Sequence, residues 1–315
     1  MQNLREQTLQ EIERRFKTDS GYVGYWDGNT RFYCPQVNGL VNICLSELGL
    51  PTREDSQRFL ESPSFDRERS LFYREVDTEG KIIVPSFNTC KNAVYALNLA
   101  SNGLAEKAEK ILKNLKSLPL YFQDTGLYGR EYNPDTEEVN SLIITQSNLW
   151  VALAYSSIGQ KEEARKIINS LEERRYNQDN RLFNSQDCRD YNYHERFFAD
   201  DQALAIITYS QLGENGKARK LIETVLESSL YDGQTGLFNS SFSGSDIDKT
   251  KSTYKNSFMA KALANLGYVD ELAEFQEGLV RELYDFEERL FNQTTRDKTK
   301  VPDNSALALV ALEYK

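Results

Sequence analysis

The sequence predicts an all-α fold, an (α/α)6 toroid built from six helical hairpins. Three observations support this expectation. A short turn motif recurs along the chain, an apolar helix that is Ala-rich in four of the six copies follows the turns, and an amphipathic helix follows each of the first five apolar helices. We expect a single domain over residues 1–315, in which the N-terminal helix completes the last hairpin.

The turn motif has the form Asp-Thr-Gly-Leu-Tyr and recurs at nearly constant intervals. Its four clear copies end in an aromatic residue, at Tyr128, Phe183, Phe238 and Phe291. The steps between them are 55, 55 and 53 residues. Such a regular step indicates a repeated supersecondary unit.

A side-chain amide lies near the start of each apolar helix. The six amides are Asn38, Asn92, Asn148, Gln202, Asn256 and Asn304. We expect them to form structural hydrogen bonds that tie the loops before these helices together. Glycines such as Gly213 and Gly267 end these helices, as is typical of C-caps. Amphipathic stretches follow, for example 161–174 and 216–229.

The two ends of the chain supply the argument for a closed ring. The sixth apolar helix has no amphipathic helix after it, and segment 4–16 has the pattern of segment 279–291. The N-terminal helix is therefore expected to complete the sixth hairpin. An open stack of hairpins would instead need polar caps at both ends.

The composition limits the classes of partner. A net charge of −10 disfavours nucleic acid and anionic membranes as partners. No apolar run approaches the roughly 18 residues that span a bilayer, and the N-terminus lacks a signal-peptide pattern, so a cytoplasmic location is expected. Four cysteines without a CxxC pair, and one histidine, predict no metal and no cofactor. The oligomeric state stays open.

This repeat pattern resembles the six-hairpin toroid superfamily, which includes glycosidases, unsaturated-uronyl hydrolases, sugar 2-epimerases and, more distantly, terpene cyclases. The resemblance covers nearly the whole chain and concerns the repeat rather than the chemistry. It implies a working surface at one mouth of the ring, where the N-termini of the inner helices converge. A polar mouth suits a hydroxyl-rich ligand, so a small carbohydrate is the expected partner.

The fourth repeat departs most from the pattern and holds the catalytic candidates. The loop before its apolar helix contains His194 and Glu195, and the helix opens with Asp200 and Asp201. Neighbouring carboxylates raise one pKa, which keeps a general acid protonated near neutrality, and carboxylate pairs serve glycoside hydrolysis. The alternatives are an N-cap role for either aspartate and a structural hydrogen bond for His194. Asp303 in repeat six is a candidate second carboxylate.

Segment 198–204, together with the turn at 231–238, is similar to part of the unsaturated-uronyl hydrolases. There an Asp at the tip of an inner helix acts as general acid and base, and the resemblance places that role on Asp200 or Asp201. Class II terpene cyclases share an Asp-Asp pair, but their full acidic motif and Gln-Trp repeats are absent. Sugar 2-epimerases typically use more than one His, so a single histidine counts against them.

Aromatic, amide and charged side chains near the expected mouth are the candidates for substrate binding. Aromatic rings can stack on a sugar, and Arg can pair with an anionic substrate group. For several of them, and for Trp150, the alternative is packing in a loop or in the core. The candidates are Tyr25, Trp26, Asp27, Arg31, Tyr128, Arg130, Gln146, Tyr191, Tyr193, Arg196, Tyr254 and Lys255.

Three hypotheses about function follow. The first is a glycosidase-type hydrolase that uses Asp200 or Asp201 as general acid. The second is a cyclase or isomerase on the same scaffold, terpene-cyclase-like or sugar-epimerase-like, which a lining of Phe and Tyr would favour. The third is a non-enzymatic toroid that binds a ligand or peptide, which a narrow or plugged cavity would favour.

Overall fold

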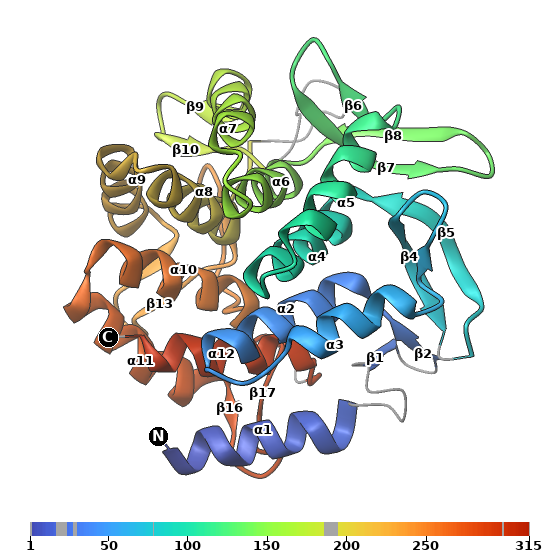
Figure 1. The fold of residues 1–315 in the computed structure, drawn as a ribbon. Helices are drawn as coiled ribbons and strands as arrows, with labels where there is room; N and C mark the ends of the chain where they lie inside the picture. Colours follow the sequence, from blue (N-terminus) through green and yellow to red (C-terminus); the bar gives the residue numbers. More distant parts are fainter. Residues whose placement is uncertain are drawn as a thin grey trace. The chain divides into compact units, whose positions relative to one another are not determined.

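A computed structural model describes residues 2–16, 24–27, 30–77, 79–185, 195–297 and 299–314 (Figure 1). These residues are mainly helical, as predicted. Contacts between residues group the chain into two compact units: unit 1 comprises Met1–Ile12 and Leu171–Lys315, and unit 2 comprises Glu13–Ser170. Because this grouping cuts through two helices, the single domain over residues 1–315 stays a prediction.

Apolar inner helices alternate with amphipathic outer helices, as the repeat predicts. The inner helices are largely buried and are α2 (Pro35–Glu47), α4 (Thr89–Ser101) and α6 (Thr145–Ser157) in unit 2, and α8 (Ala199–Leu212), α10 (Thr253–Leu266) and α12 (Pro302–Glu313) in unit 1. The outer helices are α1 (Gln2–Phe16), α5 (Ala105–Ser117), α7 (Lys161–Arg175), α9 (Asn215–Glu227) and α11 (Val269–Leu283). In the first hairpin, the short α3 (Arg53–Arg58) and η1 (Phe59–Glu61) take the place of an outer helix.

Neighbouring inner helices form the core of each unit. In unit 2, α4 packs against both α2 and α6, and in unit 1, α10 packs against both α8 and α12. The ends of α8 and α10 confirm the predicted C-caps, because Gly213 and Gly267 adopt left-handed conformations with φ of +82° and +76°.

Short antiparallel hairpins form at the turn motifs. In unit 1 they are β9 (Tyr176–Asn177) with β10 (Leu182–Phe183), β12 (Tyr231–Asp232) with β13 (Leu237–Phe238), and β16 (Tyr284–Asp285) with β17 (Leu290–Phe291). The register places two aromatic residues opposite each other, as with Tyr231 and Phe238. A further sheet in unit 1 contains β11 (Phe197–Phe198), β14 (Ser241–Ser243) and β15 (Asp246–Asp248).

Unit 2 contains a larger sheet that the helical repeat does not predict. Its central order is β1-β2-β4-β5-β7-β6, with β3 beside β4 and β8 beside β7. The strands are β1 (Gly24–Asp27), β2 (Thr30–Tyr33), β3 (Phe65–Asp66), β4 (Leu71–Asp77), β5 (Ile82–Asn88), β6 (Tyr121–Phe122), β7 (Leu127–Asn133) and β8 (Glu138–Ile143). The fold is therefore mainly helical rather than free of strands.

Four of the six predicted amides form structural hydrogen bonds to the turn before their own helix, whereas the bond shown for Asn38 is to the carbonyl of Cys34 at 3.2 Å. In α10, Asn256 donates through Nδ2 to the carbonyls of Phe238 (3.0 Å) and Ser252 (2.9 Å), and its Oδ1 accepts from the N–H of Phe238 at 2.7 Å. Each such amide therefore satisfies both backbone groups of the aromatic residue before its helix. The same pairs of bonds join Asn92 to Phe72, Asn148 to Tyr128, and Gln202 to Phe183.

In the sixth repeat the equivalent residue is Ser305, which corrects the predicted Asn304 by one position. The amide is the fourth residue of its helix in the other repeats, and the fourth residue of α12 is Ser305. Its Oγ accepts from the N–H of Phe291 at 3.1 Å. The correction makes Asp303 the second residue of its inner helix, the position that Asp200 has in α8.

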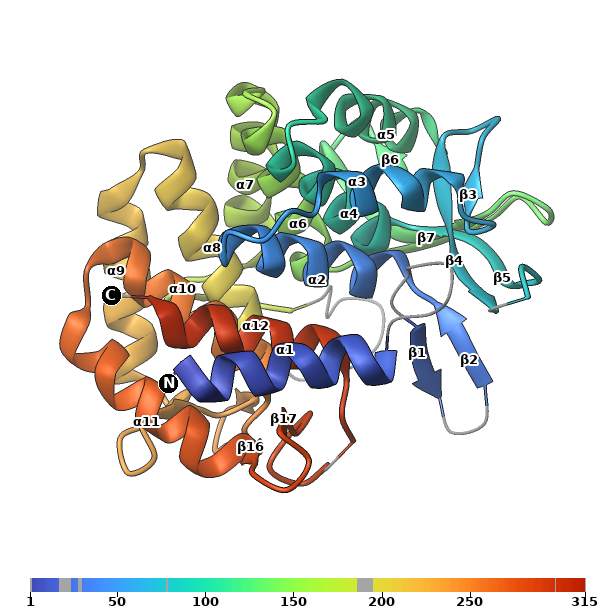
Figure 2. The ribbon, with the colours of Figure 1, turned by 60° about the horizontal axis from the view of Figure 1, so that its bottom comes forward.

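The N-terminal helix joins the last inner helix in unit 1, as the sequence predicts. Residues 1–12 belong to the same unit as α12, and Figure 2 shows α1 alongside α12. Arg5 Nη1 lies 3.6 Å from Glu313 Oε1, near the end of α12. The first helix of the chain thus completes the sixth hairpin.

We expect Asn256→Leu to destabilise the protein, because the two backbone groups of Phe238 lose their side-chain partner while they stay buried. An unsatisfied buried polar group costs about 1–3 kcal/mol, so the free energy of unfolding should fall by about 2–4 kcal/mol. Chemical denaturation measures this change. Asn215→Leu, at the exposed first residue of α9, is the control and should change stability by less than about 0.5 kcal/mol. Equal, small effects of the two substitutions would contradict the assigned role.

Candidate functional site

The candidate site in unit 1 lies at the N-terminal ends of α8 and α10. Asp200 is buried, with 6% of its surface exposed, and its Oδ1 lies 3.3 Å from Nζ of Lys255. The Lys255 ammonium also donates to the carbonyl of Ser240 at 3.1 Å and lies 3.9 Å from the centre of the Phe198 ring. A carboxylate, a carbonyl and an aromatic face therefore fix this positive charge.

The start of α8 explains why two carboxyl groups are tolerated here. Asp200 and Asp201 lie in the first helical turn, where free N–H groups and the helix dipole favour negative charge. The N-cap residue is Phe198, which makes no side-chain cap. The alternative that either aspartate is the N-cap is therefore wrong. Asp201 is only 1% exposed, so it lies deeper than Asp200.

Asp303 occupies in α12 the position that Asp200 occupies in α8, in different electrostatic surroundings. It is 8% exposed. Burial raises the pKa of Asp303 to about 6, although the backbone N–H groups of Asp303 and Asn304 act to lower it. Among the described residues, no ion pair reaches this carboxyl group, whereas Asp200 lies beside Lys255. Unit 1 thus holds two buried carboxyl groups at the N-termini of inner helices, and they differ in that Asp200 lies beside a lysine.

Among the other predicted residues of repeats four and five, Glu195 and Arg196 are exposed, and Tyr254 directly precedes Lys255. Glu195 is exposed and accepts from Asn177 Nδ2 at 2.7 Å, so it serves the β9–β10 hairpin. Arg196 is also exposed, and its Nη2 lies 3.9 Å from Asp246 Oδ2. Tyr254 precedes Lys255 in α10. Its ring packs edge-on against Phe258 with 5.0 Å between centroids. Tyr191, Tyr193 and His194 lie outside the described residues.

A second cluster of charges lies in unit 2, at the N-terminal end of α4. Lys91 donates to Glu75 Oε1 at 3.1 Å and to the carbonyl of Arg74 at 3.2 Å. Arg74 in turn donates to Glu131 Oε2 at 3.1 Å, and Glu131 also accepts from Ser86. Sequence reasoning missed Arg74 and Glu75 because they lie in β4, a strand that the repeat does not predict. Lys91 is the third residue of its inner helix, as the predicted Lys255 is, and this shared position is the signal that could have singled out Lys91.

The structure places Tyr128 in the core rather than in a binding site. Its ring is 1% exposed and packs against Tyr121 with centroids 4.9 Å apart. Its hydroxyl lies 3.4 Å from that of Tyr155, and burial raises the pKa of Tyr128. A ring without accessible surface cannot contact a substrate. The core interpretation of Trp150 is confirmed, because it is 2% exposed.

The remaining predicted binding residues all lie in unit 2. Arg130 is half-buried in β7, and Gln146 is half-buried as the second residue of α6, the position of Asp200 in α8. The backbone places Tyr25, Trp26 and Asp27 in β1 and Arg31 in β2, with Trp26 opposite Arg31. The side chains of these four residues lie outside what the structure describes.

The described residues hold neither a candidate metal centre nor a membrane-spanning helix. No group of three or more His, Cys, Asp or Glu side chains is placed there to hold a metal ion. In that same part of the chain, no helix has the length and apolar character needed to cross a membrane.

Solved structures match the chain over nearly its full length. A D-mannose isomerase superposes with a TM-score of 0.80 at 12% identity, over 99% of this chain and 95% of that one. A cellobiose 2-epimerase from Bacillus thermoamylovorans gives 0.76 at 14% identity, over 99% and 100%. A family 76 α-mannanase from Bacteroides thetaiotaomicron gives 0.72 at 13% identity, over 99% and 94%.

The chain folds as an (α/α)6 toroid. This confirms the fold that the six-hairpin repeat predicts. No protein-family model matches the sequence, and neither does any curated protein. At identities of 12–14% the structural likeness shows the toroid fold alone and leaves the reaction to be argued from the site.

Proposed function

We propose that this toroid is a carbohydrate-active enzyme that isomerises or epimerises a sugar by proton transfer. The observation that carries the proposal is the buried Asp303 carboxyl group, with a pKa of about 6, at the N-terminus of an inner helix. The likeness of the whole chain to a sugar isomerase and to sugar epimerases supports the substrate class.

Isomerisation and 2-epimerisation both need a group that removes a proton from the carbon beside a carbonyl group and then returns it. Such a group works best when its pKa lies near the working pH. Histidine meets this condition without help. A carboxyl group with a pKa of about 6 also meets it, so the single histidine of this chain does not exclude the reaction. Asp303 is the proposed acid–base residue.

Lys255 supplies the second element of the proposed mechanism. Removal of the proton leaves negative charge on the sugar oxygen, and a fixed ammonium group stabilises that charge. Asp200, Ser240 and Phe198 hold the ammonium in one place. Lys255 lies in α10, and α10 packs against both α8, which carries Asp200, and α12, which carries Asp303. Asp200 then acts as a positioning residue for Lys255.

The test is turnover of D-mannose, D-glucose and cellobiose in D2O, followed at C2 by proton NMR. We expect a second sugar to form, with deuterium entering at C2 where the abstracted proton exchanges with solvent. Absence of both product and exchange for all three sugars would contradict the proposed reaction.

Lys255→Met is expected to lower kcat about 10²–10³-fold, because the developing charge loses its fixed partner. Asp200→Asn should lower kcat less, since Lys255 keeps two of its three contacts. The control is Arg281→Met, which removes an exposed cation of α11 in the same unit. Equal rates for Lys255→Met and Arg281→Met would refute the role of Lys255.

A glycoside hydrolase is the second candidate. The buried carboxyl groups at the starts of α8 and α12 favour it, because most glycosidases act through a pair of Asp or Glu residues. The likeness to an α-mannanase gives further support. On this reading Asp200 or Asp201 pairs with Asp303. Release of new reducing ends from α-mannan oligosaccharides, without deuterium at C2, would favour hydrolysis over isomerisation.

A further inference from the structure

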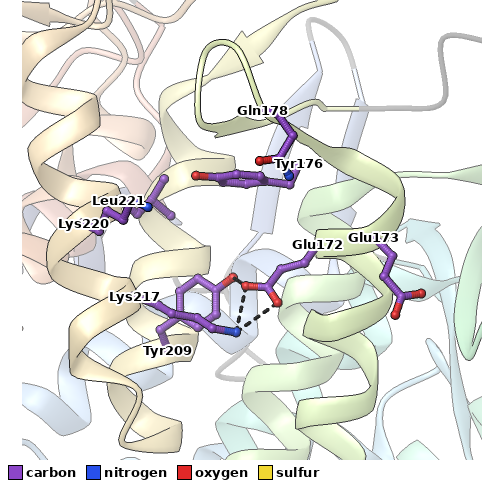
Figure 3. A pocket seen from close by; sticks show the side chains of 8 residues that line it. All are labelled: Glu172, Glu173, Tyr176, Gln178, Tyr209, Lys217, Lys220 and Leu221. Atoms are coloured by element: carbon purple, nitrogen blue, oxygen red, sulfur yellow. Dashed lines mark hydrogen bonds and ion pairs between the residues drawn. The ribbon is translucent and has the colours of Figure 1, made fainter.

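A separate cavity lies in unit 1, towards the other end of α8 (Figure 3). It has a volume of about 420 Å³ and is lined by α8, α9, the end of α7 and the β9–β10 hairpin. That volume falls within the range of small-molecule sites, about 300–1,000 Å³. Tyr209 of its wall follows Asp200 by nine residues along α8, which is roughly 13 Å at 1.5 Å per residue. The cavity is therefore distinct from the candidate catalytic site.

One side of the cavity presents polar groups in fixed positions. The Tyr209 hydroxyl donates to Glu172 Oε1 at 2.5 Å, and Lys217 Nζ lies 2.9 Å from Oε1 and 3.0 Å from Oε2. Burial, and then Glu172, raise the pKa of Tyr209, so its hydroxyl stays a donor. The Lys217 ammonium lies 3.2 Å from Glu214 Oε2 as well. A ligand therefore meets a carboxylate and an ammonium that are already oriented.

The opposite side presents an aromatic ring and an amide. Figure 3 shows Tyr176 and Gln178 across the cavity from Tyr209 and Lys217. The Tyr176 ring packs edge-on against Phe183, with 5.3 Å between centroids and 71° between planes, and it stays half-exposed. A flat ring facing fixed donors and acceptors suits a ligand that has an apolar face and many hydroxyl groups.

The charges of the lining decide between classes of polar ligand. Glu172 and Glu173 contribute two negative charges, and Lys217 and Lys220 contribute two positive ones. They cancel, so the cavity favours neither a phosphate nor a simple cation. We propose that it binds a neutral saccharide unit, stacked on Tyr176 and hydrogen-bonded to Glu172, Lys217 and Gln178. This site goes beyond the proposed reaction and does not depend on it.

The ion pair between Glu172 and Lys217 also has a structural role, so these two residues are unsuitable for substitution in a binding test. Lys116 and Glu163 form the same contact between α5 and α7 at 2.6 Å, with the charges reversed. The spacing from the glycines that end the inner helices is also the same. Lys116 follows Gly103, and Glu172 follows Gly159, by 13 residues, and Glu163 and Lys217 follow Gly159 and Gly213 by four. Such pairs join successive outer helices, so a test should leave Glu172 and Lys217 intact.

The test is isothermal titration of the whole protein with D-mannose, cellobiose and maltotriose up to about 20 mM. We expect at least one of these sugars to bind, Tyr176→Ala to weaken that binding at least fivefold, and Gln178→Ala to weaken it less. Tyr231→Ala is the matched control, because Tyr231 has the same place in the next hairpin. It should leave the affinity unchanged, and Tyr176→Ala should leave kcat/KM for turnover unchanged.

Four outcomes overturn the proposal. The first is that none of the three sugars binds, and the second is that Tyr176→Ala and Tyr231→Ala have equal effects. The third is binding that Lys255→Met abolishes and Tyr176→Ala does not, because the sugar then occupies the candidate catalytic site alone. The fourth is tighter binding of galacturonate or glucosamine than of the neutral sugars, because it contradicts the charge argument.

Discussion

Asp303→Asn is expected to lower activity and raise stability at neutral pH. Loss of a general acid–base group reduces kcat by about 10²–10⁴-fold. The amide keeps an oxygen that can accept from the backbone N–H groups at the start of α12, so the helix should still form. Burial of an ionised carboxylate disfavours the folded state at neutral pH, and the Asn variant has no such charge to bury.

The sign of the stability change follows from the pKa of Asp303. Burial raises it from 3.8 to about 6 in the folded protein. The folded state therefore binds this proton more tightly, a stabilising effect that is complete below about pH 4 and disappears as the pH rises through 6. A shift of about two pKa units corresponds to about 3 kcal/mol. Relative to the Asn variant, the natural protein should thus lose about this much stability between pH 4 and pH 7.

Thermal unfolding of both proteins at pH 4, 5, 6 and 7 measures the effect. The difference in Tm should be small at pH 4 and grow in favour of Asp303→Asn as the pH rises. Asp246→Asn, at a largely exposed carboxylate, should show no such trend. A difference in Tm that does not vary with pH would mean that Asp303 is not the buried acid described here. This readout stays informative even if the enzyme acts on another substrate.

Gly278→Ala is expected to destabilise the protein by about 2–4 kcal/mol. Helix propensity alone predicts the opposite, because Ala is about 1 kcal/mol better than Gly inside a helix. At Gly278 in α11, however, a Cβ would lie 2.2 Å from the carbonyl oxygen of Thr235. From the other side, a Cβ on Gly236 would lie 2.8 Å from the carbonyl oxygen of Glu274. Helix and turn therefore meet backbone to backbone, and no rotamer change can relieve the clash.

Gly216→Ala is the matched control for this prediction. Gly216 also lies in an outer helix, α9, but a Cβ added there would meet nothing within 4 Å beyond the backbone of its own helix. Ala should leave stability unchanged there or raise it by up to about 1 kcal/mol. The denaturation midpoint should therefore fall for Gly278→Ala and stay the same or rise for Gly216→Ala. A stable Gly278→Ala variant would show that α11 can move away from the turn.

Local periodicity predicted the helices well, because amphipathic spacing and glycine caps are properties of short segments. The stretch expected at 161–174 forms α7 (Lys161–Arg175), and the one at 216–229 forms α9 (Asn215–Glu227). The sequence predicts Asn304 rather than Ser305 in the sixth repeat, because the side chain that accepts from the Phe291 N–H there is a hydroxyl and not an amide. Pro302, a residue type common at the first position of a helix, was the better marker.

The candidate site was only partly predictable, because its decisive properties are not local. The repeat singled out Asp200, Lys255 and Asp303 as residues at helix starts. The ion pair between Asp200 and Lys255 depends on how α8 packs against α10, and the pKa of Asp303 depends on its burial. Tyr128 shows the converse error, since an aromatic residue in a turn can equally lie in the core. The cavity beside Tyr209 forms where α8, α9, the end of α7 and the β9–β10 hairpin meet, so it depends on packing between separate elements.

The hydrogen bonds between the turn residues and the fourth residues of the inner helices make the position of each helix independent of the length of the loop before it. The same bond from a turn residue to the fourth residue of the next helix spans 20, 20, 19, 18 and 14 positions in five repeats. Each loop is thus closed at its base, whatever its length. Insertions and deletions between the clamped residues can accumulate without shifting a helix. The loops can therefore change in sequence and length one at a time during evolution, and substrate specificity can change while the helices keep their positions.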